Sequence, residues 1–253
     1  MLQRKARTKK SSGTTRTLAA LRKELYALAD PVDATFLQGF FKTAPGRYGA
    51  GDKFLGLRVP DLRQLVREYP ELEDSQALDM LASPWHEERL LALLFLVEKY
   101  RLGDDSAREN IHHAYLANTR YINNWDLVDA SAQYIVGRHL DARNISLLKR
   151  LARSDDIWER RIAIVATFHF IRADEFRPTL KIAKLLVDNP HDLIHKAVGW
   201  MLREVGKRDR KAEDAFLSKY YRKMPRTMLR YAIERHPERV RQQYLRGKRA
   251  STG

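Results

Sequence analysis

Apolar residues recur at intervals of three and four along almost the whole chain, from Leu18 to Tyr244. This spacing places them on one face of a helix, and almost no stretch alternates apolar and polar residues as a strand does. Pro60, Pro84 and Pro190 each stand where the first residue of a helix is expected, the last two after a capping Ser or Asn. The pattern predicts an all-α fold of short helices joined by short links.

The helical pattern also repeats, with a period of about 36 residues. Trp125 lies 36 residues after Arg89 and 36 before Arg161, and Lys196 follows Arg161 by 35. Paired helices with such a period are typical of an α-solenoid, in which each repeat buries its face against its neighbours. Helix pairs of similar length can also produce a period by chance. The positions that become equivalent along one concave surface are Asp129, Val165 and Trp200.

Length and composition limit the class of protein. A chain of 253 residues with 44% hydrophobic residues can form one large domain or two smaller ones around a sizeable core. The sequence contains no cysteine, which excludes disulfides, thiolate zinc sites and cysteine nucleophiles. No run of about 18 apolar residues and no apolar signal core occur, so we expect a soluble, cytoplasmic protein.

The net charge of +15 is concentrated at the ends of the chain. Residues 1–17 hold six Lys or Arg and no acid, and residues 235–253 hold six against Glu238, so the ends account for +11. We expect a basic disordered tail at 1–17, a helical domain at 18–240 and a second basic disordered tail at 241–253. Such tails attract any polyanion, so charge alone does not establish a nucleic-acid partner.

Trp125 and Asp129 stand four residues apart and would share one helix face. A carboxylate on a face that meets a polyanion is unfavourable unless it has a role. Cleavage through a cationic, sugar-centred transition state is one reaction that uses it. The alternative is that Trp125 packs inward, while Asp126 or Asp129 stabilises the start of the helix.

Lys196, Trp200, Arg203 and Lys207 fall at i, i+4, i+7 and i+11, which is a single stripe on a helix. Cations beside an aromatic ring suit a phosphate backbone, because the cations displace counterions and the ring lies against sugar or base. A solvated basic face with a half-buried Trp is the alternative. Gly199, beside the Trp, would let another backbone approach closely.

Only one of the adjacent Arg160 and Arg161 can share the face of the apolar stripe, and Arg161 has the register of Trp125. We expect Arg161 either to pair with Asp129 or to hold a phosphate through two hydrogen bonds. Trp158 is expected in the core. The further candidates for contacts with a phosphate backbone are Arg160, Arg58, Arg63, Tyr48, Arg226 and Arg230.

Other chemistry finds little support. His191 and His195 share a face, but no third metal ligand and no intervening glutamate accompany them. The glycines at 49 and 51 do not precede a Lys-Ser or Lys-Thr, so they do not form a phosphate-binding loop. His112 and His113 are expected on the surface, and no Ser, His and Asp stand at recognisable spacing.

Four motifs occur in order: FLGLRVP at 54–60, WDLVD at 125–129, IWERR at 157–161 and KAVGWMLRE at 196–204. Together they resemble the AlkD-type DNA alkylation-repair glycosylases over about residues 50–235. The resemblance implies a HEAT-like α-solenoid that cups double-stranded DNA on a concave face and hydrolyses the N-glycosidic bond of alkylated purines. It also implies a monomer that needs no cofactor, no metal and no membrane.

The resemblance assigns residues too. Asp129 matches the catalytic aspartate, Arg161 the arginine near it, and Trp125 and Trp200 the indoles that contact sugar and backbone. Asp192-Leu193 stands where relatives can have paired aromatics, and Asn124 where a second tryptophan can precede Trp125. These departures leave the range of lesions and the distortion of DNA open. A non-catalytic solenoid that binds nucleic acid or protein is the alternative function.

Overall fold

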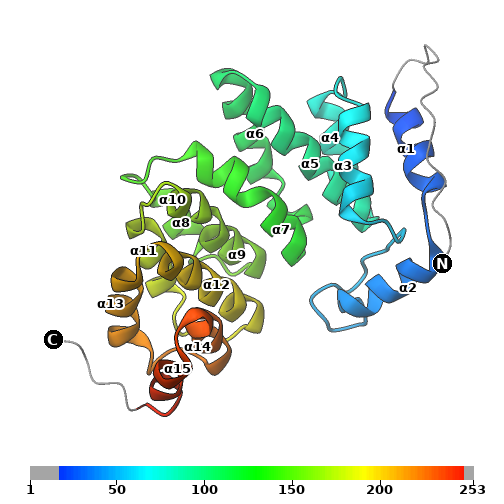
Figure 1. Cartoon of the computed structure of the whole chain (residues 1–253). Helices are drawn as coiled ribbons and strands as arrows, with labels where there is room; N and C mark the ends of the chain where they lie inside the picture. The colour runs from blue at the N-terminus through cyan, green and yellow to red at the C-terminus, as the bar shows by residue number, and fades with distance from the viewer. Residues whose placement is uncertain (1–16, 248–253) are drawn as a thin grey trace.

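The computed structural model describes residues 17–247, in which the helices follow a curved path from one end to the other (Figure 1). The α-helices are α1 (Leu18–Ala27), α2 (Pro31–Phe40), α3 (Val59–Glu68), α4 (Asp74–Leu81), α5 (His86–Leu102), α6 (Asp105–Ala117), α7 (Trp125–Ala132), α8 (Ser146–Leu151), α9 (Ile157–Ala166), α10 (Phe168–Arg172), α11 (Arg177–Leu185), α12 (Asp192–Arg208), α13 (Arg210–Tyr220), α14 (Arg226–Ala232) and α15 (Glu238–Leu245). Two 3₁₀ turns, η1 (Thr119–Tyr121) and η3 (Ile233–Arg235), and one π-helical turn, η2 (Gln133–Gly137), complete the secondary structure. No strand occurs within these residues, so the predicted all-α solenoid is confirmed.

The repeat is visible in the helices α5, α7, α9 and α12, which we call the central row. They begin at residues 86, 125, 157 and 192, in steps of 39, 32 and 35, close to the predicted period. Each helix of the row packs against the next, and α5, α9 and α12 also pack against the shorter helices α4, α8 and α11 that precede them. Each pair thereby buries its apolar side against its neighbours. Within residues 17–247, no helix has the length and apolar character needed to cross a membrane.

Two helices begin later than proline predicts. α5 starts at His86 and α12 at Asp192, two residues after Pro84 and Pro190. The Ser83 hydroxyl accepts a hydrogen bond from the Trp85 N–H at 3.1 Å, and the Asn189 side chain accepts one from the His191 N–H at 3.0 Å. These local turns give the backbone N–H groups hydrogen-bond acceptors before the helix begins. The N-cap therefore lies two residues later in the chain than predicted.

The start of α5 holds the N-terminal helices in place through buried charge. The Glu87 carboxylate accepts hydrogen bonds from the backbone N–H groups of residues 55–57 at 2.9, 2.8 and 3.3 Å. Glu88 accepts from Tyr26 at 2.6 Å and from Arg22 at 3.3 Å. Both carboxylates are almost fully buried, so each depends on these donors.

Two expectations about packing are confirmed. Trp158 is only 7% exposed and belongs to the main core. Gly199 lies where α12 meets α14, and a Cβ atom at this position would come within 2.5 Å of the Met228 carbonyl oxygen. The absence of a side chain is therefore what allows the two helices to approach this closely.

Two expectations need correction. His112 is buried rather than on the surface, because its ring stacks on that of His139 with centroids 3.8 Å apart; His113 is exposed as expected. The helical domain also continues past residue 240, since α15 extends to Leu245. Tyr244 anchors this last helix by packing against Tyr221 and His236. The segments predicted to be disordered at 1–16 and 248–253 lie outside the described residues.

Candidate active site

An ion pair between Asp129 and Arg161 joins three helices of the central row. The Arg161 Nε and Nη2 atoms donate to the two carboxylate oxygens of Asp129 at 3.0 and 2.8 Å. The remaining Nη1 donates to the carbonyl oxygen of Leu193, in the first turn of α12, at 2.6 Å. Two roles were expected for Arg161, pairing with Asp129 or holding a phosphate, and the structure shows the ion pair with Asp129. All three guanidinium nitrogens are engaged, which fixes the carboxylate in one orientation.

The two members of the pair differ in exposure. The side chain of Arg161 is 5% exposed, whereas that of Asp129 is 20% exposed. Burial raises the pKa of the Asp129 carboxyl above its ordinary value, and the Arg161 guanidinium opposes this effect. Both oxygens accept hydrogen bonds from Arg161, an arrangement that favours the ionised form. Asp129 is thus an oriented anion with one side open to solvent.

Trp125 lies one turn before Asp129 at the start of α7, and it is half-buried rather than sunk in the core. Its indole stacks on Phe41 with centroids 5.2 Å apart and meets the edge of Phe40 at 5.9 Å. These two rings come from the end of α2. Together they form a wall beside the indole, which we call the aromatic wall.

Sequence reasoning missed this aromatic wall. Phe36 and Phe40 are 58% and 52% exposed and stack on each other at 6.1 Å. A signal was present, because Val32, Phe36 and Phe40 form one apolar stripe at i, i+4 and i+8. Since Ala34 and Leu37 form the buried face of α2, this second stripe is left for solvent or for a ligand.

A buried network of charges supports the start of α7. The imidazole of His86 lies between the carboxylates of Asp126, at 2.8 Å from Nε2, and Asp52, at 3.3 Å from Nδ1. Asp52 also accepts from Arg89 at 2.7 Å and from Asn124 at 3.2 Å. The two carboxylates thus share His86 as their hydrogen-bond donor. This arrangement fixes the N-terminal turn of α7 against α5.

His86 also contacts the aromatic wall. Its ring stacks on Phe54 at 4.6 Å and lies 4.9 Å from Phe41, the ring that stacks on Trp125. Burial alone would lower the pKa of His86, but Asp126 and Asp52 outweigh it and raise the pKa to about 9. The imidazolium is therefore the form present near neutral pH.

This raised pKa predicts that part of the stability is lost in alkali. Because the pKa of His86 is higher when folded, its contribution is full below about pH 6.5 and disappears as the pH rises through about 9. The loss should be ~3 kcal/mol, since one pKa unit corresponds to about 1.4 kcal/mol. Urea denaturation of the wild type and of His86→Gln at pH 6, 8 and 10 should give free energies of unfolding that converge with rising pH. His113→Gln, at an exposed histidine, is the control, and parallel profiles for wild type and His86→Gln would contradict the assignment.

The cations of the α12 stripe are paired with carboxylates. Lys196 contacts Asp192 at 2.7 Å, and Lys207 contacts Glu204 at 2.7 Å. Arg203 donates to Glu234 and to Glu204. Sequence reasoning placed these cations on one face but did not pair them, although Asp192 and Glu204 stand within four residues of their partners.

Trp200 lies on the same helix and is half-buried. Its indole N–H donates to Glu204 at 3.2 Å, and its ring meets the edge of Phe168 at 5.6 Å. Glu204 therefore accepts hydrogen bonds from Trp200, Arg203 and Lys207 at once. The stripe is a connected hydrogen-bond network rather than a set of separate charges.

The other candidates for DNA contacts are spread over several elements. Arg58 pairs with Asp33 at 2.6 Å. Tyr48 is half-buried against the edge of Trp158 at 6.1 Å. Arg160 and Arg226 donate to backbone carbonyl oxygens, and Arg63 and Arg230 are exposed. The geometry thus brings together Asp129, Arg161 and Trp125, whereas Arg58, Tyr48, Arg160 and Arg226 take part in other contacts and Arg63 and Arg230 lie on the surface.

The two histidines of α12 have structural roles. The His191 Nδ1 atom accepts the N–H of Leu193 at the start of the helix, and His195 bonds to the Asn189 carbonyl oxygen. Among residues 17–247, no group of three or more His, Asp or Glu side chains is arranged to hold a metal ion.

Comparisons with known proteins show the family and the fold. The family model described as "DNA alkylation repair enzyme" matches residues 21–236. A structure described as a predicted DNA alkylation repair enzyme from Enterococcus faecalis is similar in fold, with a TM-score of 0.63 and 14% sequence identity, over 83% of this chain and 97% of that one. No curated protein sequence matches the chain. Since the family model spans most of the sequence, the chain belongs to the DNA alkylation repair enzyme family.

Proposed function

We propose that the protein is a monofunctional DNA glycosylase that hydrolyses the N-glycosidic bond of N3- and N7-alkylpurines in double-stranded DNA. The observation that carries the proposal is the Asp129 carboxylate, held by Arg161 through two hydrogen bonds yet 20% exposed, one turn from the half-buried Trp125. Membership of the DNA alkylation repair enzyme family supports alkylated DNA as the substrate.

The chemistry follows from the charge of the substrate. A purine alkylated at N3 or N7 is already cationic, so it can leave without being protonated. The bond between C1′ and the purine nitrogen breaks, its electron pair goes to the purine, and positive charge develops on the deoxyribose. Water then adds to C1′ and loses a proton to Asp129 or to solvent. An oriented carboxylate stabilises the transition state of this reaction more than the ground state.

Arg161 positions the anion. Because its guanidinium is buried and fully bonded, it holds Asp129 without itself facing the substrate. The carboxylate therefore needs little reorganisation when charge develops on the sugar, which is the condition for a large electrostatic effect.

The indoles of Trp125 and Trp200 are suited to contact the sugar and the backbone. The face of an indole attracts a cation, so a ring against the deoxyribose would add to the stabilisation by Asp129. The exposed Phe36 and Phe40 extend this surface beyond Trp125.

DNA binding at the α12 stripe would require exchange of partners. Lys196 and Lys207 are paired with carboxylates in the free protein, so a phosphate must replace or share those contacts. An exposed pair such as Lys196–Asp192 contributes only about 0.2–1 kcal/mol, which a phosphate can exceed. Binding at this stripe should therefore be sensitive to salt.

The test is release of the modified base. Purified protein is incubated with double-stranded DNA methylated at purines, and free N3-methyladenine and N7-methylguanine are quantified by chromatography. We expect release well above that of DNA incubated alone, together with abasic sites and no strand cleavage. Tight, salt-sensitive binding without any base release would contradict the proposal and favour a non-catalytic nucleic-acid-binding solenoid.

A further inference from the structure

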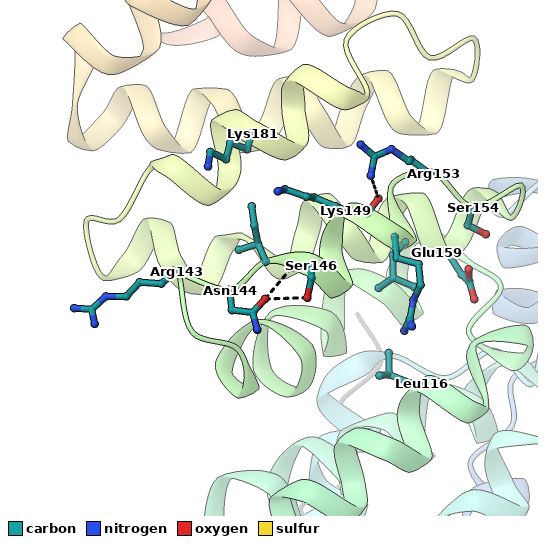
Figure 2. A pocket seen from close by; sticks show the side chains of 12 residues that line it. Leu116, Arg143, Asn144, Ser146, Lys149, Arg153, Ser154, Glu159 and Lys181 are labelled. Carbon is teal, nitrogen blue, oxygen red and sulfur yellow. Dashed lines mark hydrogen bonds between the residues drawn. The ribbon is translucent and has the colours of Figure 1, made fainter.

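A cavity of about 930 Å³ opens on a part of the molecule that the proposed reaction does not use. It is bounded by the end of α6, the segment before α8, α8 itself, the turn into α9, and α11 (Figure 2). We call it the α8 pocket. Within the part of the chain that the structure describes, its lining residues do not include Asp129, Arg161 or Trp125 and form no hydrogen bond with them.

The lining of the α8 pocket is strongly basic. Among the described residues that line it, the one acid is Glu159, which accepts a hydrogen bond from the Thr119 hydroxyl at 2.9 Å. The five cations of the lining are Arg143, Lys149, Arg150, Arg153 and Lys181. Lys149 and Lys181 extend into the space between α8 and α11, and Arg153 donates to the carbonyl oxygen of Lys149 at 3.4 Å (Figure 2).

These cations lack the carboxylate partners that the cations of α12 have. Within residues 17–247, no carboxylate lies within 4.0 Å of any of the five. On α12, by contrast, Lys196, Arg203 and Lys207 are each paired with an acid. Like charges gathered without counter-charges repel one another, and an anionic ligand removes that cost.

The α8 pocket faces away from the candidate active site. Glu159 lines the pocket and Arg161 binds Asp129, and both belong to α9. Two residues along a helix correspond to a rotation of roughly 200°, so these side chains leave α9 on opposite sides. A ligand in the α8 pocket therefore does not compete for the surface at Asp129.

The residue types indicate what kind of anion fits. The lining contains no aromatic ring on which a base can stack and no glycine loop that can enclose the phosphates of a nucleotide. Long cationic side chains spread over separate elements instead suit phosphates that are spaced along a backbone.

We propose that the α8 pocket binds the phosphate backbone of a second segment of double-stranded DNA, apart from the segment at Asp129. A protein that holds two segments can pass from one to the other without complete release, which shortens a search along non-specific DNA. This inference needs DNA binding but not base excision.

Energy transfer between two undamaged duplexes tests the proposal. One 16-base-pair duplex carries a donor fluorophore and another an acceptor, and the full-length protein is added at low salt. The pocket variant is Lys149→Ala/Arg153→Ala/Lys181→Ala. The control is Lys184→Ala/Lys211→Ala/Lys219→Ala, which removes the same number of positive charges from exposed positions of α11 and α13 outside the α8 pocket.

We expect the wild type and the control to bring the two duplexes together and the pocket variant to lose most of the transfer. For the second binding event, the slope of log K against log[salt] should become less steep by about 0.9 per removed cation, about 3 in total. Equal transfer by the pocket variant and the control would overturn the proposal and assign bridging to other charges or to protein association. Stronger capture of a single-stranded RNA than of the second duplex, lost in the pocket variant, would also overturn it. Because both duplexes are undamaged, the transfer does not require base excision, so failure of the excision assay does not affect this test.

Discussion

Asp129→Asn should lower the rate of base release from N7-methylguanine DNA by about 100- to 1,000-fold, the usual effect of removing one preorganised electrostatic contact. The amide keeps the size of the side chain but removes the negative charge that would face the deoxyribose. It also accepts only one of the two hydrogen bonds from Arg161. Single-turnover assays with enzyme in excess measure the chemical step, and a fluorescence binding assay should show affinity for the duplex within about threefold of wild type.

Asp126→Asn is the matched control for this substitution. Asp126 lies on the same helix, three residues earlier, but its carboxylate points to His86 rather than to Arg161. We expect it to lower stability while base release falls by less than about tenfold, well short of the effect of a direct electrostatic contact. If Asp126→Asn abolished release and Asp129→Asn did not, Asp129 would have no place in the mechanism.

Arg161→Ala should have the larger effect on folding, with a loss of about 3–5 kcal/mol in the free energy of unfolding. It leaves the largely buried Asp129 carboxylate without its counter-charge and the Leu193 carbonyl oxygen without its donor, and it empties space between helices. Equilibrium denaturation in urea measures the loss, provided that the transition remains two-state.

Two further variants separate the ion pair from the packing. In an Asp129→Asn background, Arg161→Ala should lower the free energy of unfolding clearly less than it does in the wild type, because no buried charge is left unpaired. Arg160→Ala changes the neighbouring arginine, which bonds to the carbonyl oxygens of Ser154 and Asp155. A cost for Arg160→Ala equal to that of Arg161→Ala would contradict the central role of the pair.

The repeat explains why part of the candidate site was predictable. Once a period of about 36 residues is recognised, Arg161 falls one repeat after Trp125, and it meets Asp129 because adjacent helices of the central row pack in register. The helical class followed from the spacing of apolar residues in the same way. Both are regularities within the chain, so the sequence alone carries them.

The partners of the site were not predictable in this way. Asn124 meets Asp52 across 72 residues, and Asp52 lies in the segment between α2 and α3, which has no repeat register. Phe41 reaches Trp125 because of how α2 folds back on α7. Contacts of this kind depend on the path of an irregular segment, for which neither periodicity nor residue type gives a position.

The origin of the aromatic wall has a consequence for protein engineering. Phe40 and Phe41 precede the first helix of the repeating row, and the backbone that follows them is held by the three hydrogen bonds to Glu87. Transplanting Trp125, Asp129 and Arg161 onto an unrelated helical-repeat scaffold would reproduce the anion but leave the indole without its neighbours. A redesigned enzyme of this kind would have to carry the N-terminal segment together with its carboxylate anchor.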